Sequence, residues 1–198
     1  MDPRLPSPDS VTLGIIAGGR GSRLGGMEKA WLTLDRVPQV SRLEQVLRPD
    51  AANVLVSANR SQSRYRQAGF SVVADRLAGD WGPLAGLDAL ANACRTPWLL
   101  TVPVDLVHSP GGLVRELWAA GKSAGAFAVD DDGPQPLVAL WPNEALRRAM
   151  EKAIACQALA VKDLQATLGM KPARLRGVRF GNLNTFDDLA SAGIQPPR

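Results

Sequence analysis

The strongest constraint on this chain is a short apolar segment that runs into a glycine-rich, basic loop. Val11–Ala17 is mostly apolar and predicts a buried strand. Residues 18–29 follow, and they contain five glycines and three cationic side chains. Glycine lets successive backbone N–H groups point toward one place, and such a concave backbone binds anions. We therefore interpret the loop as a phosphate-binding site, with a merely flexible loop as the structural alternative.

Two well-known phosphate loops do not fit this spacing. In a P-loop the last glycine is followed directly by Lys and then by Ser or Thr, whereas Lys29 comes three residues after Gly26. The dinucleotide fingerprint Gly-x-Gly-x-x-Gly begins at Gly19 but fails at Leu24. Arg20, Arg23 and Lys29 add positive charge to the loop, which suits a nucleoside triphosphate.

Length and composition exclude several classes of protein. A chain of 198 residues suits one domain, which we place at residues 11–198 after a flexible tail at residues 1–10 that holds three prolines. The net charge of +4 permits an anionic ligand, but the cations are scattered and aromatic residues are few, which argues against nucleic acid. Cys94, Cys156 and the single His108 do not form a zinc motif, and we expect both cysteines to be small core residues. Neither a signal peptide nor a long apolar run is evident, so we expect a cytoplasmic protein without a membrane segment.

Short apolar runs alternate with helical patterns along the chain. The expected strands are 11–17, 53–57, 70–74, 98–102, 124–129, 137–141 and a last one from residue 174 to 178 or 180. The expected helices are 40–47, 61–68, 83–94, 113–120, 143–155 and 160–168. This alternation predicts an α/β fold of three layers, a mostly parallel sheet with helices on both faces. The hairpin near residue 130 adds one antiparallel strand.

Polar side chains follow three of the predicted strands. Asn59, Asp75 and Asp105 each stand at the carboxyl end of a strand, where ligands bind in open α/β sheets. A carboxylate there, Asp105 above all, is a natural Mg²⁺ ligand, with a capping or loop carboxylate as the structural alternative. Gly82 precedes a helix that begins at Pro83, whose free N–H groups point at whatever lies in front.

Two acidic segments have structural explanations. Asp130–Asp132 lies beside Gly133 and Pro134, and we favour a solvated hairpin tip over a metal site. Gln135 at the entry of the next strand could line a pocket. Thr185 and Asp188 have the spacing of a capping box at the start of a helix. The nearby pair Asn182 and Asn184 has no such explanation.

Together these motifs resemble the bacterial molybdenum cofactor guanylyltransferase family, over residues 11–191. The matching segments are Ile16–Gly19, Arg23–Gly26, Lys29, Asn59–Arg60, Asp75, Gly82–Gly86, Pro103–Asp105, Gln135–Pro136 and Asn182–Thr185. The first motif is shared by many sugar and alditol nucleotidyltransferases. The combination of Gly-Pro-Leu-Ala-Gly with Asn-Leu-Asn-Thr is what indicates this family. The resemblance implies a Rossmann-like nucleotidyltransferase fold.

The resemblance also implies roles for individual residues. A guanine nucleotide would be bound by Ile16, Ala17, Gly18, Lys29, Asn59, Asp75 and Asp105, with Arg23, Gly19, Gly26 and Gly82 on the phosphate side. Lys29, Asp105 and Arg23 would be catalytic, and Asp105 would hold Mg²⁺. Gln135, Asn182 and Asn184 would lie on the molybdopterin side. The implied substrates are GTP and molybdenum-bearing molybdopterin, with transient contacts to molybdenum-insertion and molybdoenzyme-maturation proteins.

The implied reaction needs no general base. A phosphate monoester is mostly dianionic at pH 7, so the terminal phosphate of molybdopterin could attack the α-phosphorus of GTP directly and displace pyrophosphate. The sequence departs from the family pattern at Glu28, Leu106-Val107, Gln135 and Phe186. Two alternatives therefore stay open. One is a related nucleotidyltransferase, which transfers a cytidylyl group to molybdopterin or acts on a sugar phosphate. The other is a non-catalytic GTP-binding homologue.

Overall fold

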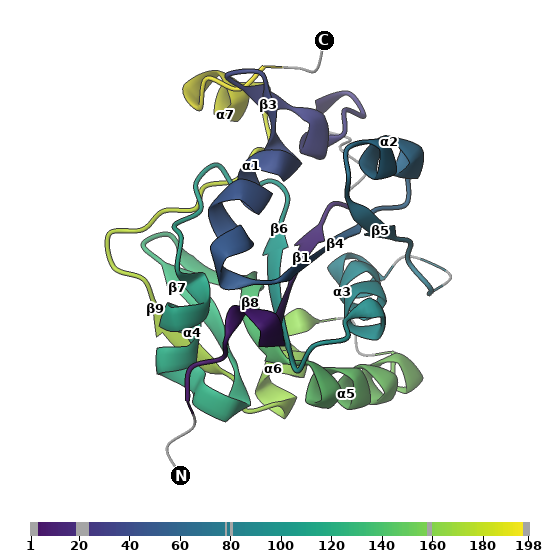
Figure 1. Cartoon of the computed structure of the whole chain (residues 1–198), viewed down its shortest axis with the longest axis vertical. Helices are drawn as coiled ribbons and strands as arrows, with labels where there is room; N and C mark the ends of the chain where they lie inside the picture. Colours follow the sequence, from purple (N-terminus) through teal and green to yellow (C-terminus); the bar gives the residue numbers. More distant parts are fainter. Residues whose placement is uncertain (1–3, 19–23, 78, 80, 158–159, 196–198) are drawn as a thin grey trace.

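The computed structural model describes residues 4–18, 24–77, 79, 81–157 and 160–195. Their main sheet has seven strands in the order β5-β4-β1-β6-β8-β7-β9 (Figure 1). The strands are β1 (Val11–Ile16), β4 (Asn53–Ser57), β5 (Ser71–Val73), β6 (Trp98–Pro103), β7 (Ala126–Asp130), β8 (Gly133–Pro142) and β9 (Lys171–Arg174). Only β8 is antiparallel to its neighbours. The mostly parallel α/β fold with one antiparallel strand is therefore confirmed.

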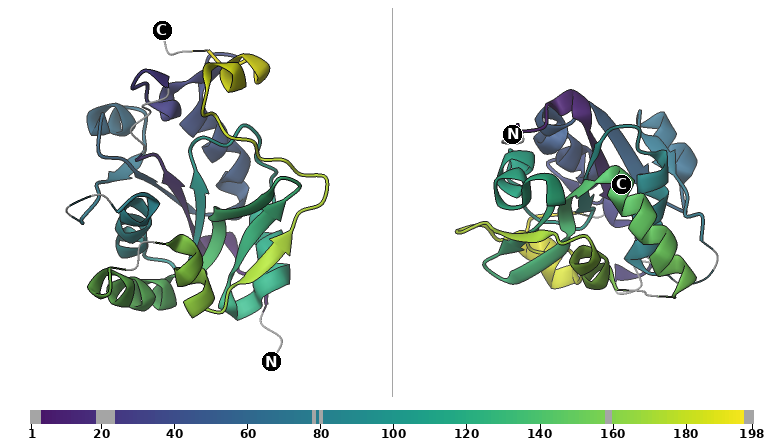
Figure 2. Two further views of the ribbon diagram at one scale, coloured as in Figure 1. Left: turned by 180° about the vertical axis from the view of Figure 1, so that it is seen from behind. Right: turned by 90° about the horizontal axis from the view of Figure 1, so that it is seen from below.

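Helices cover both faces of the sheet. On one face lie α1 (Gln39–Leu47), α2 (Gln62–Gln67) and α4 (Leu113–Gly121), which share a core cluster with the odd-numbered residues of β1. On the other face lie α3 (Pro83–Ala93), α5 (Asn143–Ala155) and α6 (Val161–Thr167), which bury a second cluster (Figure 2). Short 3-10 helices span η1 (Pro8–Ser10), η3 (Lys29–Trp31), η4 (Arg48–Asp50) and η5 (Lys122–Ala124).

The carboxyl-terminal segment crosses over to the amino-terminal part of the chain. The strands β2 (Thr33–Leu34) and β3 (Val37–Pro38) form a separate two-stranded hairpin, and α7 (Phe186–Ser191) lies beside it. Backbone hydrogen bonds of 2.8 and 2.7 Å join Thr33 and Gln195. A third apolar cluster combines Leu24 and Leu32 with Leu183, Leu189 and Ile194. These contacts bring residues 182–188 next to the loop that follows β1.

Two glycines allow α3 to pack closely on the sheet. A Cβ atom at Gly14 of β1 would stand 3.0 Å from a methyl carbon of Leu90. A Cβ atom at Gly86 of α3 would stand 2.8 Å from Ser57 Oγ and 3.3 Å from Ile16 Cγ2. The distance of 2.8 Å is too short for an added side-chain atom, and the distances of 3.0 and 3.3 Å would require the neighbouring side chains to shift. The second glycine of Gly-Pro-Leu-Ala-Gly therefore sets how near the helix comes to β1 and β4.

Three expectations from the sequence are wrong in detail. The last strand is Lys171–Arg174 and not residues 174–180, because Pro172 is acceptable on an edge strand and the chain turns at Gly177, whose φ is +74°. Within the expected tail, Pro8–Ser10 forms η1, and the Pro8 carbonyl accepts a hydrogen bond from Ala52 N. Cys94 is buried, but Cys156 is exposed just after α5.

In the part of the chain that the structure describes, no helix combines the length and apolar character needed to span a membrane.

Candidate active site

Most of the predicted nucleotide-binding residues that the structure describes lie at the carboxyl ends of β5, β4, β1 and β6. Chain order runs from β1 outward to β4 and β5, and then returns to the other side of β1 with β6. A crevice opens at such a switch point, where α/β proteins bind ligands. Val104 N donates to Ile16 O at 3.0 Å, and Ala17 N donates to Ser57 O at 2.9 Å. The chain that leaves β1 is thus fixed to both neighbouring strands.

The glycine-rich loop begins at this point. A Cβ atom added to Gly18 would meet nothing within 4 Å, so the space beside this residue is open. Gly26 has a φ of +81° and Gly82, the residue before α3, a φ of +52°, and both values favour glycine. The Gly26 carbonyl accepts a hydrogen bond from Arg60 at 3.4 Å. Two residues with predicted roles, Gly19 and Arg23, lie outside the described residues.

Lys29 is held between two oxygen acceptors. Its Nζ donates to Asp105 Oδ2 at 2.8 Å and to Asn184 Oδ1 at 2.8 Å. The side chains of Lys29 and Asp105 are 20% and 24% exposed, so the ion pair faces solvent only in part. Asp105 follows β6, and Asn184 reaches the pair from a position 155 residues along the chain from Lys29. The structure therefore unites three of the predicted site residues.

Asp188 fixes the backbone that carries Asn184. Its Oδ2 accepts hydrogen bonds from Asn184 N at 2.9 Å and Thr185 N at 2.8 Å, and Asp188 N donates to Thr185 Oγ1 at 3.2 Å. These bonds hold the pKa of the Asp188 carboxyl below its ordinary value, and the bond from Asn184 N has the largest effect. The predicted capping box is confirmed. It also orients Asn184, which the sequence did not indicate.

A second pair lies at the ends of β4 and β5. Asn59 Nδ2 donates to Asp75 Oδ2 at 2.6 Å, and Asp75 N donates back to Asn59 Oδ1 at 2.9 Å. Ser57 Oγ lies 3.5 Å from the other Asp75 oxygen. The two predicted nucleotide-binding residues are thus locked to each other. They present amide and carboxylate groups that can recognise a base or a ribose.

Glu28, which departs from the family pattern, makes contacts next to Lys29 that the sequence does not indicate. Its Oε1 accepts from Ser61 Oγ at 2.7 Å and lies 3.6 Å from Arg60 Nε, while its Oε2 accepts from Trp31 Nε1 at 3.1 Å. Ser61 has a φ of +49°, a strained value for serine. Glu28 therefore ties the loop before Lys29 to the segment that carries Asn59.

The hairpin between β7 and β8 has the exposed tip that the sequence predicted at Asp131 and Asp132, but Asp130, the last residue of β7, is buried. Asp130 is only 6% exposed, and its carboxylate accepts hydrogen bonds from Asp132 N, Gly133 N and Phe180 N at 2.9–3.0 Å. Burial raises the pKa of Asp130, but the bonds from Phe180, Gln135 and the turn outweigh it and lower the pKa below its ordinary value. The alternation of apolar and polar residues in the sequence cannot predict that this carboxylate is buried, because its hydrogen-bond partners come from the turn and from a distant segment.

Gln135 and Asn182 lie at the same edge of the sheet but outside the Lys29 cluster. Gln135 Nε2 donates to both oxygens of Asp130 at 3.3 Å, and no bond from Gln135 to Lys29, Asp105 or Asn184 is found in the described residues. Asn182 pairs through its backbone with Leu106, directly after Asp105. Of the predicted molybdopterin-side residues, Asn184 thus bonds to Lys29, Gln135 bonds to Asp130, and Asn182 pairs with Leu106 through its backbone.

The donor set at Asp105 suits one kind of metal ion. Among the described residues, no three His, Cys, Asp or Glu side chains come together. Mg²⁺ is commonly bound by one or two carboxylates and by substrate phosphates. Asp105 is a partly exposed carboxylate beside the glycine-rich loop, so its chemistry fits an ion that arrives with phosphates.

Comparison with known proteins gives the context for this geometry. Residues 13–168 match the model of the MobA-like NTP transferase domain. The molybdenum cofactor guanylyltransferase of Yersinia pseudotuberculosis is 36% identical over 132 residues, which cover 66% of this chain and 68% of that protein. The Yersinia pestis protein of the same name gives the same values.

Solved structures share the fold at lower identity. Molybdopterin-guanine dinucleotide biosynthesis protein A from Archaeoglobus fulgidus aligns with a TM-score of 0.68 at 19% identity, covering 91% of this chain and 96% of that one. The 2-C-methyl-D-erythritol 4-phosphate cytidylyltransferase from Thermus thermophilus gives 0.67 at 23%, with the same coverage. The glycine-rich loop after β1, the residues at the strand ends and the match over residues 13–168 lead to one conclusion: the chain belongs to the MobA-like NTP transferase family.

Proposed function

We propose that this protein is a molybdenum cofactor guanylyltransferase. It would transfer GMP from GTP to the terminal phosphate of molybdenum-bearing molybdopterin, giving the guanine dinucleotide and pyrophosphate. The observation that carries the proposal is the placement of Lys29 between Asp105 and Asn184 at the switch point. The guanylyltransferase relatives at 36% identity support this choice among nucleotidyl transfers.

The proposed reaction is a direct displacement at phosphorus. An oxygen of the acceptor phosphate forms a bond to the α-phosphorus of GTP, and the bond to the bridging oxygen breaks, so pyrophosphate leaves with its electron pair. The acceptor is mostly dianionic at pH 7 and needs no base. What the protein contributes is alignment of the reactants and positive charge near the phosphates. Lys29, held in place before substrate arrives, supplies such a charge.

The other site residues have complementary roles in this proposal. The open backbone at Gly18 contacts the guanine nucleotide together with Ile16 and Ala17, and the Asn59–Asp75 pair contacts its nucleoside. Gly26 receives the phosphates, together with Gly19, Gly82 and Arg23. Asp105 would hold Mg²⁺, which supplies further charge neutralisation when bound. Asn184 orients Lys29 and, with Asn182 and Gln135, stands on the acceptor side.

A nucleotide panel tests the proposal directly. Pyrophosphate release would be measured from GTP, CTP, ATP and UTP with Mg²⁺, each with and without molybdenum-bearing molybdopterin. Of the four nucleotides, we expect only GTP to release pyrophosphate, and only when molybdenum-bearing molybdopterin is present. We expect no release with an Asp105→Ala variant that retains the wild-type melting temperature. Release from CTP instead would assign the protein to cytidylyl transfer. Binding of GTP without any release would support a non-catalytic homologue and would overturn the proposal.

A further inference from the structure

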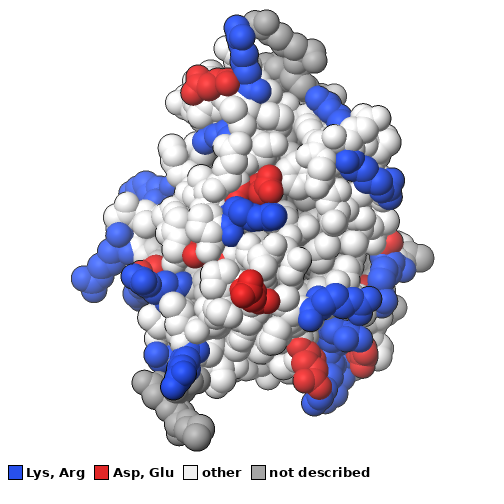
Figure 3. All heavy atoms as spheres, viewed as in Figure 1, with Lys and Arg blue, Asp and Glu red and all other residues white. Residues whose placement is uncertain are grey.

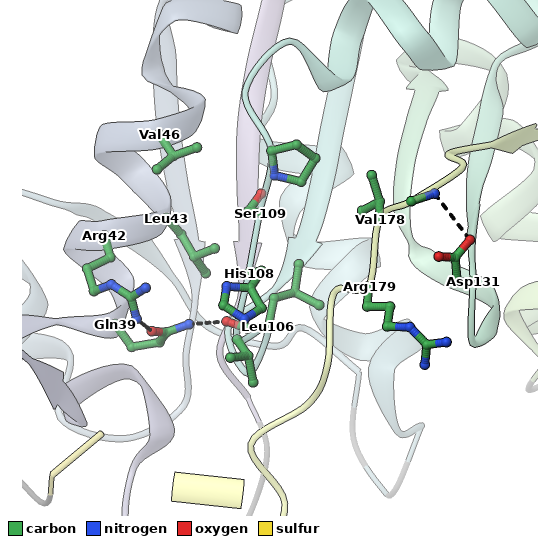
Figure 4. A pocket seen from close by; sticks show the side chains of 13 residues that line it. Gln39, Arg42, Leu43, Val46, Leu106, His108, Ser109, Asp131, Val178 and Arg179 are labelled. Atoms are coloured by element: carbon green, nitrogen blue, oxygen red, sulfur yellow. Dashed lines mark hydrogen bonds between the residues drawn. The ribbon is translucent and has the colours of Figure 1, made fainter. Parts of the chain in front are cut away.

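A cavity of about 570 Å³ opens on the face of the sheet that α1 covers, and its lining includes Leu106, the residue after Asp105 (Figure 4). One wall comes from α1, with Arg42, Leu43 and Val46, and the other walls come from residues 106–110 and 177–179. This volume lies in the usual range for sites that bind small organic molecules. The predicted nucleotide-binding residues do not line this cavity, which we call the α1 pocket.

The lining of the α1 pocket combines apolar walls with polar groups. Leu43, Val46 and Val178 supply apolar surface, while Arg42, His108 and Arg179 supply N–H donors. Figure 4 shows Arg42 and Arg179 on opposite sides of the pocket, with His108 between them. On the same face of the molecule, basic side chains are otherwise spread over several elements (Figure 3). Asp131 also lines the pocket and supplies acceptor oxygens, so the pocket is suited to a polar organic ring that both donates and accepts hydrogen bonds.

Ser109 is the most informative residue of the lining. Its Oγ is buried, and it has no hydrogen-bond partner within the described part of the chain. A buried hydroxyl without a partner costs stability, so such groups in native structures call for an explanation. A ligand in the pocket would supply the missing partner.

A backbone ribbon connects the α1 pocket to the Lys29 cluster. Segments 105–108 and 180–183 run antiparallel, with bonds from Leu183 N to Asp105 O at 2.8 Å, Val107 N to Gly181 O at 3.3 Å and His108 N to Phe180 O at 2.9 Å. At about 3.3 Å per residue, the ribbon spans roughly 10 Å from Asp105 to His108. Asp105 and Asn184 stand at one end, and His108 and Arg179 stand at the other.

We propose that the α1 pocket binds the ring end of the phosphorylated acceptor, while the acceptor phosphate lies at Lys29 and Asp105. This inference rests on the proposed function, which requires an acceptor with a phosphate at one end and a polar heterocycle at the other. The Asn59–Asp75 pair, which we assign to the nucleoside, lies across β1 at the ends of β4 and β5. The acceptor therefore approaches from the β6 side, where the ribbon leads into the pocket.

Two substitutions test the pocket without touching the Lys29 cluster. Ser109→Ala removes a hydroxyl that has no partner in the described structure, so a purely structural role predicts equal or higher stability. Val46→Trp places an indole in the pocket from a residue that is 41% exposed, which limits the effect on folding. Arg48→Ala is the matched control, because Arg48 follows the same helix, pairs with Glu44 and does not line the pocket.

The measurement is direct binding of molybdopterin, with GTP binding measured in parallel. We expect the dissociation constant of molybdopterin to rise about threefold to tenfold in Ser109→Ala, as for the loss of one hydrogen bond. In Val46→Trp we expect a rise of more than about tenfold, because the ligand and the indole compete for one space. The affinity for GTP and the melting temperature should match wild type in Ser109→Ala, and Arg48→Ala should match wild type throughout.

The outcomes separate this inference from the proposed function. If both pocket variants bind molybdopterin as wild type does, or if wild type does not bind it, the pocket assignment is overturned. If wild type binds molybdopterin, Ser109→Ala weakens that binding, and no nucleotide is turned over, the pocket assignment stands while the proposed reaction fails.

Discussion

At the scale of single residues, Lys29 is the side chain whose position matters most. Two acceptors hold its ammonium group, so little reorganisation is needed when phosphates arrive. We expect Lys29→Ala to lower kcat/KM for GTP by an amount equivalent to about 2–4 kcal/mol, comparable to the loss of one preorganised donor. Steady-state kinetics of pyrophosphate release would measure this loss. Lys162→Ala is the control, since Lys162 is exposed on α6. An unchanged kcat/KM for GTP would show that Lys29 has no part in the reaction.

Glu28 acts at the same scale as a positioning residue. It joins Ser61 and Trp31 through hydrogen bonds of 2.7 and 3.1 Å, and neither bond survives truncation. We expect Glu28→Ala to raise KM for GTP more than it lowers kcat, and to cost about 1–3 kcal/mol of unfolding free energy. Glu28→Asp should reverse part of the rise in KM for GTP and recover part of the loss in unfolding free energy. Urea unfolding and GTP kinetics test this, with Glu44→Ala on α1 as the control. Equal KM values for Glu28→Ala and wild type would contradict the assignment.

At the scale of elements, the β7–β8 hairpin depends on the charge of Asp130. Because the folded pKa of Asp130 lies below the ordinary value of 3.8, the carboxylate stabilises the protein fully above that value. This contribution is lost as pH falls through the lowered pKa. At neutral pH we expect Asp130→Asn to cost about 1–3 kcal/mol, because an amide nitrogen would face backbone N–H donors. Below pH 3.8 the difference from wild type should shrink.

Asp132→Asn is the matched control in the same hairpin. Asp132 is 47% exposed on its side chain and pairs with Arg179 at the surface, so its removal should cost less than about 1 kcal/mol. Urea unfolding at several pH values would measure both variants. A cost for Asp130→Asn that stays constant down to acid pH would rule out the charge as its source.

At the scale of the whole molecule, sequence periodicity predicts most of the architecture. Strand Asn53–Ser57 and helix Asn143–Ala155 lie where the pattern places them, because each buries a clear apolar face. Lys29 and Asp105 come together because the segments that carry them follow β1 and β6, which are neighbours and end at the same edge of the sheet. What periodicity cannot give is contact between distant segments. The partners of Glu28 and Asp130, the bond from Lys29 to Asn184 and the α1 pocket all depend on loops that tertiary packing places.

The position of β1 inside the sheet, between β4 and β6, also has a consequence for synthesis of the chain. Its first residue pairs with Trp98, and its last pairs with Ser57 on one side and Pro103 on the other. Translation proceeds at about 5–20 residues per second, so β1 waits several seconds for its second neighbour. During that interval one edge of a mostly apolar strand has no hydrogen-bond partners, and such an edge can pair with another chain. Aggregation of this protein in the cell should therefore depend on the rate at which residues 58–103 are made.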